Sequence, residues 1–282
     1  MNLPHRLLPG LLLALPLAAA AQDAVRIEKD IDYLGGGRKE KADLYLPAKA
    51  EGGKKFPGIV IIHGGGWTGG DKGAAREQNI GTNLALRGYV GLSINYLLAT
   101  TNQPTWPQNL HDCKTAVRWL RQNAARLNID PDRIGVIGGS AGGHLATMVA
   151  LTGPDAGLDP KGPYGEFSCR VQAAVDLYGP AQVRRDHVMI GKPRAEAEET
   201  YQAAEPIHHA TKDDPPMYIL HGTGDKTVPV EQSKILAAAL EKAGVPHKLL
   251  IIEGAPHSFH LQPKQRDLRD EIIGFFDQHL KR

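Results

Sequence analysis

Short apolar runs alternate along the chain with longer stretches whose apolar residues recur at helical spacing. The run at 58–63 (GIVIIH) is continuously apolar, which is typical of a parallel strand buried on both faces. The predicted strands are 25–29, 41–46, 58–63, 89–96, 133–137, 171–178, 217–221 and 248–252, and the predicted helices are 74–87, 107–127, 140–151, 230–243 and 264–280. This alternation predicts one α/β domain over residues 22–282, with a mostly parallel sheet covered by helices on both faces.

The segment 181–216 breaks this pattern, because it is rich in charged side chains and has little apolar periodicity. We interpret it as an insertion over the sheet, since long excursions of this kind are often lids or binding loops. A solvated helical spacer is the alternative, and the sequence leaves the two open.

Residues 1–21 have the three parts of a secretory signal peptide. Arg6 lies near the start, an apolar run covers 7–17, and four alanines at 18–21 precede Gln22. The apolar run is shorter than a bilayer span requires. We therefore expect cleavage after Ala21, a secreted or periplasmic product, and no stable membrane insertion.

Composition and charge narrow the functional classes. The 282 residues include 33 basic and 31 acidic side chains, so a net charge of +2 leaves no electrostatic footprint for nucleic acid. The two cysteines, Cys113 and Cys169, either form a disulfide in an oxidising compartment or remain buried thiols, and both alternatives stay open. No pattern predicts a metal or a cofactor.

The sharpest chemical signal is a G-x-S-x-G pattern at 138–142 (GGSAG), between a predicted strand and a predicted helix. Such a turn holds its serine in a strained conformation with the hydroxyl exposed, and the helix N-terminus places N–H groups near developing negative charge. Ser140 is therefore the candidate nucleophile. A glycine-rich turn without chemistry is the alternative, which the flanking strand and helix disfavour.

A second signal is HGGGW at 63–67, at the end of the predicted strand 58–63. Three consecutive glycines let backbone N–H groups turn toward a substrate oxygen, as an oxyanion hole requires. We assign the donors to Gly65, Gly66 and Trp67 and to the N–H of Ala141. A tight loop without a ligand is the alternative, and we expect His63 to brace this loop rather than act as a base.

Asp225 and His257 complete the chain order Ser, Asp, His that accompanies this nucleophile pattern. Each follows a predicted strand, and open α/β sheets gather their sites at the carboxyl ends of the strands. Asp176 and His260 compete for the acid and base roles, although we expect Asp176 to be structural. A zinc site at His257 and His260 would need a third ligand, which the sequence does not supply convincingly.

Together, HGGGW, the stretch 112–121 (DCKTAVRWLR), GGSAGGH, DLYGP and HGTGDKTVP resemble the α/β-hydrolase superfamily over essentially the whole mature chain. The resemblance is to secreted esterases near the feruloyl and acetylxylan esterases, and also to hormone-sensitive-lipase-like esterases and arylformamidases. It implies a Ser140–Asp225–His257 triad, an oxyanion hole at HGGGW, and esters of short acyl or hydroxycinnamoyl groups, often on plant cell-wall sugars. Trp67, Tyr178 and Phe259 adjoin these motifs and either line an apolar acyl pocket or belong to the core.

Two rival functions stay open at this point. A prolyl-oligopeptidase-like serine peptidase shares the triad order and the HGTGD segment, although such enzymes usually carry a large additional domain. A catalytically inactive binding protein on the same scaffold is disfavoured because all three triad positions are filled. We expect a small-molecule or saccharide ester as substrate, and the oligomeric state is left open.

Overall fold

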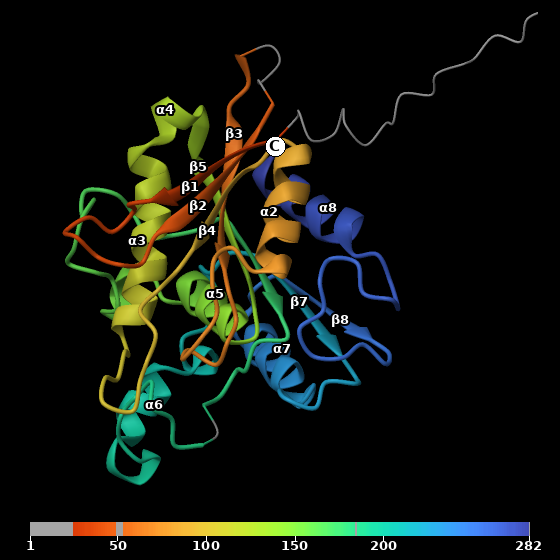
Figure 1. Ribbon diagram of the computed structural model, residues 1–282. Helices are drawn as coiled ribbons and strands as arrows, with labels where there is room; N and C mark the ends of the chain where they lie inside the picture. Colours follow the sequence, from red (N-terminus) through yellow and green to blue (C-terminus); the bar gives the residue numbers. More distant parts are fainter. Residues whose placement is uncertain (1–24, 49–52, 184, 282) are drawn as a thin grey trace, which may run out of the picture.

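The computed structural model describes residues 25–48, 53–183 and 185–281, so the predicted signal peptide at 1–21 and its cleavage site lie outside the described residues. Eight strands form one sheet in the order β1-β2-β4-β3-β5-β6-β7-β8 (Figure 1). Strand β2 pairs antiparallel with β1 and β4, and all the other neighbours are parallel. The strands are β1 Val25–Ile31, β2 Ala42–Pro47, β3 Phe56–Ile62, β4 Val90–Ile94, β5 Ile129–Gly139, β6 Ala173–Leu177, β7 Met217–Gly222 and β8 His247–Ile252.

Helices cover both faces of the sheet, which confirms the predicted α/β architecture. Helices α2 (Ala75–Leu86) and α8 (Arg269–Leu280) pack on one face, and α3 (Gln108–Gln122), α5 (Ala141–Leu151) and α7 (Glu231–Ala243) pack on the other. Short helices α4 (Ala124–Leu127) and α6 (Glu198–Ala203) complete the set. Among the described residues, no helix combines the length and the apolar character that crossing a bilayer requires.

Strand β3 shows why the run at 58–63 is continuously apolar. Val60 and Ile62 belong to the core on the α3 and α5 face, whereas Ile59 and Ile61 belong to the core on the α2 and α8 face. Successive side chains of a strand point to opposite faces, so both faces need apolar residues when both are covered. All four side chains are fully buried.

Several element boundaries differ from the sequence prediction. Strand β5 begins at Ile129 rather than at residue 133, because the N–H of Phe56 donates to the carbonyl of Asn128 and draws the chain into the sheet early. Helix α8 begins at Arg269 rather than at residue 264, since the N–H of Leu268 donates to the carbonyl of Leu261 and closes a loop before the helix. Both differences come from contacts between segments that local periodicity cannot detect.

The segment 181–216 connects the neighbouring strands β6 and β7 and includes α6, which lies beyond the end of the sheet in Figure 1. It is packed as well as charged, because Met189, Tyr201 and Ala204 are fully buried. The carbonyl of Met189 accepts hydrogen bonds from the N–H groups of Thr105 and Trp106. The segment lies at the end of the sheet where the candidate catalytic residues meet. Its role as a mobile lid stays a prediction.

Candidate active site

Ser140 occupies the sharp turn between β5 and α5. Its backbone has φ 58° and ψ −124°, a strained left-handed conformation, and its N–H donates to the carbonyl of Leu177 at 2.9 Å. Glycine is required on both sides of Ser140, because neighbouring backbone groups come too close to leave room for a side chain. A Cβ at Gly138 would lie 2.2 Å from the carbonyl oxygen of Gly142, and a Cβ at Gly142 would lie 2.1 Å from that of Ile62. The serine therefore stands at the N-terminus of α5 with its hydroxyl directed into a cavity.

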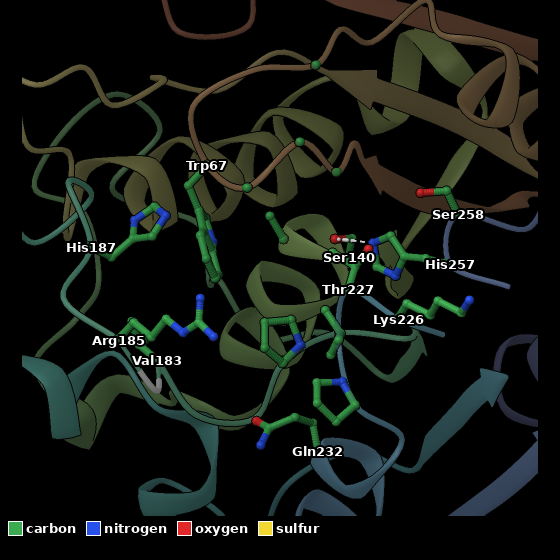
Figure 2. Close-up of a pocket in the computed structure, with 18 of the residues that line it drawn as sticks. Trp67, Ser140, Val183, Arg185, His187, Lys226, Thr227, Gln232, His257 and Ser258 are labelled. Carbon is green, nitrogen blue, oxygen red and sulfur yellow. Dashed lines mark hydrogen bonds between the residues drawn. The ribbon is translucent and has the colours of Figure 1, made fainter. Parts of the chain in front are cut away.

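Three of the sequence-predicted side chains meet at this turn in a hydrogen-bonded row (Figure 2 draws Ser140 and His257). The Nε2 atom of His257 lies 3.0 Å from the Oγ of Ser140, and its Nδ1 lies 2.6 Å from Oδ2 of Asp225. The row joins residues 117 and 32 positions apart in the chain, because β5, β7 and β8 run parallel and end at the same edge. An imidazole held between a hydroxyl and a carboxylate has the geometry for general base catalysis.

Asp225 is held by more than the imidazole of His257. Its Oδ1 accepts hydrogen bonds from the N–H groups of Thr227 at 2.8 Å and Val228 at 2.9 Å. Its Oδ2 also lies 3.2 Å from Nε2 of His221, a buried side chain whose Nδ1 is 2.7 Å from the Oγ of Ser233. Burial lowers the pKa of His221. A neutral imidazole with its proton on Nε2 can donate to the carbonyl of Val228 at 2.9 Å while accepting from Ser233, which holds the ring beside Asp225.

The predicted oxyanion-hole residues line the same cavity as Ser140. Gly65, Gly66 and Trp67 have φ values of 117°, 61° and 59°, so the loop after β3 turns through three positive-φ residues. The carbonyl of Gly65 accepts from the N–H groups of Thr68 and Gly69, and in the described chain no backbone hydrogen bond uses the N–H of Gly65 or Gly66 as donor. Ala141 is the first residue of α5, where helical N–H groups lack an intrahelical partner. These N–H groups are available to a ligand oxygen.

Trp67 is fixed by a chain of hydrogen bonds that reaches the segment 181–216. Its Nε1 donates to Nδ1 of His144 at 3.2 Å, and Nε2 of His144 lies 2.7 Å from the carbonyl oxygen of Ala204. Burial lowers the pKa of His144 to about 4, so this imidazole stays neutral with Nε2 as the donor. The ring of His187 also packs edge-on against Trp67, with ring centroids 5.0 Å apart. Trp67 lines the cavity, and its contact with a substrate stays a prediction.

The prediction that Tyr178 and Phe259 line an acyl pocket is wrong, because neither side chain lines the cavity. Both are buried, and their rings pack edge-on with centroids 4.5 Å apart. Tyr178 lies behind the catalytic row, where its ring contacts His257 edge-on with centroids 5.0 Å apart. Its hydroxyl donates to the carbonyl of Phe259 at 2.8 Å and accepts from Arg76 at 3.0 Å. Tyr178 follows the end of β6 with a positive φ, so its ring turns inward beneath the imidazole.

The residues that competed for the acid and base roles, Asp176 and His260, lie outside the catalytic row. Asp176 is fully buried on β6, its Oδ1 accepts from the N–H of Gly179 at 2.8 Å, and burial raises its pKa to about 7. His260 is exposed, and the imidazole bonded to Ser140 is that of His257. His63 braces the loop, because its Nδ1 lies 2.7 Å from the carbonyl oxygen of Gly64 and its ring stacks on Tyr96.

The two cysteines are buried thiols and do not form the disulfide that the sequence left open. Cys113 and Cys169 are both free and buried. In the described parts of the chain, no group of three or more His, Cys, Asp or Glu side chains is placed to hold a metal ion.

A cavity of about 980 Å³ opens over Ser140 and His257. Its walls come from the glycine loop after β3, the start of α5, the first residues of the segment 181–216, and the loops after β7 and β8 (Figure 2). Among the residues that sequence reasoning missed are Arg76 and Arg185 on the cavity wall, and His221, which lies beside Asp225. Only His221 had a detectable signal, since it ends a predicted apolar strand four residues before Asp225.

Comparisons with known proteins agree with this architecture. The probable carboxylic ester hydrolase LipM of Mycobacterium tuberculosis is 33% identical over 218 residues, which are 73% of this chain and 49% of LipM. This chain spans about half the length of these curated relatives, which include LipM, LipQ and LipC of the same organism.

Among solved structures, a truncated carbohydrate esterase from gut microbiota is similar with a TM-score of 0.82 and 26% identity, covering 91% of this chain and 97% of that one. A butyrate-bound esterase 2 of Thermogutta terrifontis is similar with a TM-score of 0.71 and 30% identity, covering 90% and 91%. These neighbours establish the α/β-hydrolase fold. The sequence also matches the BD-FAE family over residues 42–240, which include β2 to β7 and the nucleophile turn. The chain therefore belongs to the BD-FAE family of α/β-hydrolases.

Proposed function

We propose that this protein is a serine esterase that hydrolyses carboxylic esters through an acyl-enzyme on Ser140. The observation that carries the proposal is the row Ser140–His257–Asp225, which faces a cavity lined by a glycine loop. Relatives named as esterases and carboxylic ester hydrolases support it.

In the proposed mechanism, Nε2 of His257 accepts the proton of the Ser140 hydroxyl while Oγ attacks the ester carbonyl. Asp225 keeps the other imidazole proton on Nδ1 and stabilises the charged ring. The N–H groups of Gly65, Gly66 and Ala141 stabilise the tetrahedral oxyanion, with Trp67 completing the loop. His257 then protonates the leaving alcohol. Water deacylates Ser140 in the second half of the reaction, with His257 again as the base.

We further propose that the substrates carry short acyl or hydroxycinnamoyl groups attached to plant cell-wall sugars. The support is the resemblance to carbohydrate esterases and the cavity of about 980 Å³, whose size is at the upper end of the range for small-ligand sites. A structural neighbour with bound butyrate supports a short acyl group. The signal-peptide pattern at 1–21 supports an exported location, which is part of the same proposal.

The test combines active-site labelling with hydrolysis. We expect a fluorophosphonate probe to label the folded protein and 4-nitrophenyl acetate to be hydrolysed, whereas Ser140→Ala should lose labelling and at least about 10⁴-fold in kcat. Ser168→Ala, which changes an exposed serine outside the cavity, should keep both. Absence of labelling in folded wild-type protein would contradict the proposal. A preference for an aminoacyl anilide over acetyl and feruloyl sugar esters would instead favour a peptidase.

A further inference from the structure

The charged side chains on the cavity wall are all basic. Arg76, Arg185 and Lys226 line the described cavity together with His187 and His257, and no Asp or Glu residue does. The whole chain is nearly balanced, with 33 basic and 31 acidic residues, so composition does not explain this one-sided wall. These positively charged side chains differ in whether they are available to a substrate.

Two of the three cationic side chains, Arg76 and Lys226, are poorly placed to bind a substrate. The guanidinium of Arg76 forms an ion pair with Glu77 at 2.6 Å and donates to the hydroxyl of Tyr178, so its charge is compensated from behind the cavity. Lys226 is exposed, and Figure 2 shows its ammonium pointing away from Ser140. Burial lowers the pKa of His187, which favours its neutral form.

Arg185 is the remaining cation, and it differs from the other arginines of this protein. Every other arginine in the described ranges makes an ion pair or a side-chain hydrogen bond. Arg185 has no such partner among the described residues. Figure 2 shows its guanidinium beside the ring of Trp67, across the cavity from Ser140 and His257.

The acidic groups near Arg185 already have other partners. Oδ1 of Asp186 accepts from the N–H of Arg194 at 2.8 Å. Glu205 accepts from the N–H of Val183 at 2.9 Å and forms an ion pair with Arg194 at 2.7 Å. These bonds anchor the backbone on both sides of Arg185 while leaving its guanidinium free. Arg185 is exposed at the cavity wall and presents there a donor with five N–H groups.

We propose that Arg185 binds a carboxylate carried by the ester substrate and so makes this protein selective for acidic esters. The inference rests on the proposed esterase function. A planar guanidinium matches a carboxylate through two parallel hydrogen bonds, which are stronger than neutral ones. Two substrate types share this chemistry, an ester on a uronic-acid unit and an ester whose acyl group ends in a second carboxylate.

The experiment compares matched acidic and neutral esters. One arm uses 4-acetoxybenzoate and 4-acetoxybenzamide, which differ by a carboxylate on the alcohol side. The other uses the mono-4-nitrophenyl ester of adipate and its terminal amide, which differ on the acyl side. We expect the wild-type protein to show a roughly 10-fold higher kcat/KM for the acidic member of one pair, mainly through a lower KM. The pair that shows the preference identifies whether Arg185 binds a carboxylate on the alcohol side or on the acyl side of the ester.

Variants of Arg185 and Lys226 distinguish a specific contact between Arg185 and the substrate carboxylate from a general effect of positive charge near the cavity. Arg185→Gln should bring the ratio of acidic to neutral kcat/KM close to 1, with the larger loss on the acidic ester, and Arg185→Lys should retain part of the preference. Lys226→Gln is the matched control and should leave the ratio within about twofold. Equal loss in Arg185→Gln and Lys226→Gln, or a wild-type ratio near 1 in both arms, would overturn the inference while leaving the esterase function intact. Failure of the neutral esters and of fluorophosphonate labelling would instead overturn the proposed function itself.

Discussion

At the scale of single residues, Tyr178 joins the supports of the catalytic row. Its hydroxyl connects the ion-paired Arg76 to the carbonyl of Phe259, two residues beyond His257, and its ring contacts the imidazole. Burial raises the pKa of Tyr178 to about 12, so the hydroxyl remains protonated and able to donate. Tyr178 is a positioning residue in this arrangement, because it touches the base and not the substrate cavity.

Replacing Tyr178 with Phe should therefore affect turnover more than binding. The change leaves the carbonyl of Phe259 and one N–H of Arg76 without this partner, which should cost about 1–3 kcal/mol of unfolding free energy. A less firmly held His257 should lower kcat by about 10-fold with KM within about twofold. Steady-state kinetics and urea unfolding measure the two effects.

Tyr218→Phe is the control for that substitution, because the buried Tyr218 loses a similar bond, to Glu271, away from the active site. It should lose stability and keep kcat. Equal kcat losses in the two variants would show that Tyr178 acts only through stability.

At the scale of elements, the close crossing of α5 over the end of β3 places Ser140 above the glycine loop. Gly142 makes this approach possible, since its Cα faces the carbonyls of Ile62 and His63. A side chain there would push the start of α5 away from the loop that follows β3. The position of the nucleophile relative to the oxyanion-hole residues thus depends on one missing Cβ.

Gly142→Ala should lower the free energy of unfolding by about 3 kcal/mol or more, because the new Cβ would meet backbone atoms that cannot rotate away. The matched control is Gly274→Ala in α8, where an added Cβ meets nothing within 4 Å. That variant should gain about 0.5–1 kcal/mol from helix propensity. Urea unfolding of both variants is the measurement, and a loss below about 1 kcal/mol in Gly142→Ala would contradict the crossing argument.

At the scale of the whole molecule, the buried carboxyl of Asp176 links stability to pH. Its Oδ2 is buried without a hydrogen-bond partner, and burial raises its pKa from 3.8 to about 7. The folded state therefore holds a proton that the unfolded chain releases near pH 4. This contribution to stability is fully present below the unfolded pKa and is lost as pH rises through about 7.

Asp176→Asn should remove this dependence. Relative to the variant, the wild-type protein should lose on the order of 2–4 kcal/mol of unfolding free energy between pH 4 and pH 8. Other titrating groups cancel in the difference between the two proteins as long as they are unperturbed. Urea unfolding at a series of pH values tests this, and parallel curves for the two proteins would rule out a buried proton on Asp176.

The α/β class and the candidacy of Ser140, Asp225 and His257 for one site could be predicted from local patterns in the sequence. The reason is that periodicity and turn chemistry are local. An apolar run bounded by glycines identifies a strand, and parallel strands must end at a common edge. The glycines around Ser140 reflect a backbone constraint that is visible in five residues of sequence.

Which side chains face the cavity and which lie behind it could not be predicted in this way, because that depends on how distant segments pack together. Tyr178, Phe259 and Trp67 all adjoin motifs, yet Trp67 lines the cavity while the other two pack behind His257. His221 reaches Asp225 across a turn, and Arg185 enters the site from the segment between β6 and β7. These outcomes depend on strand order and on the backbone angles of single residues, which bring distant segments together and which no local pattern records.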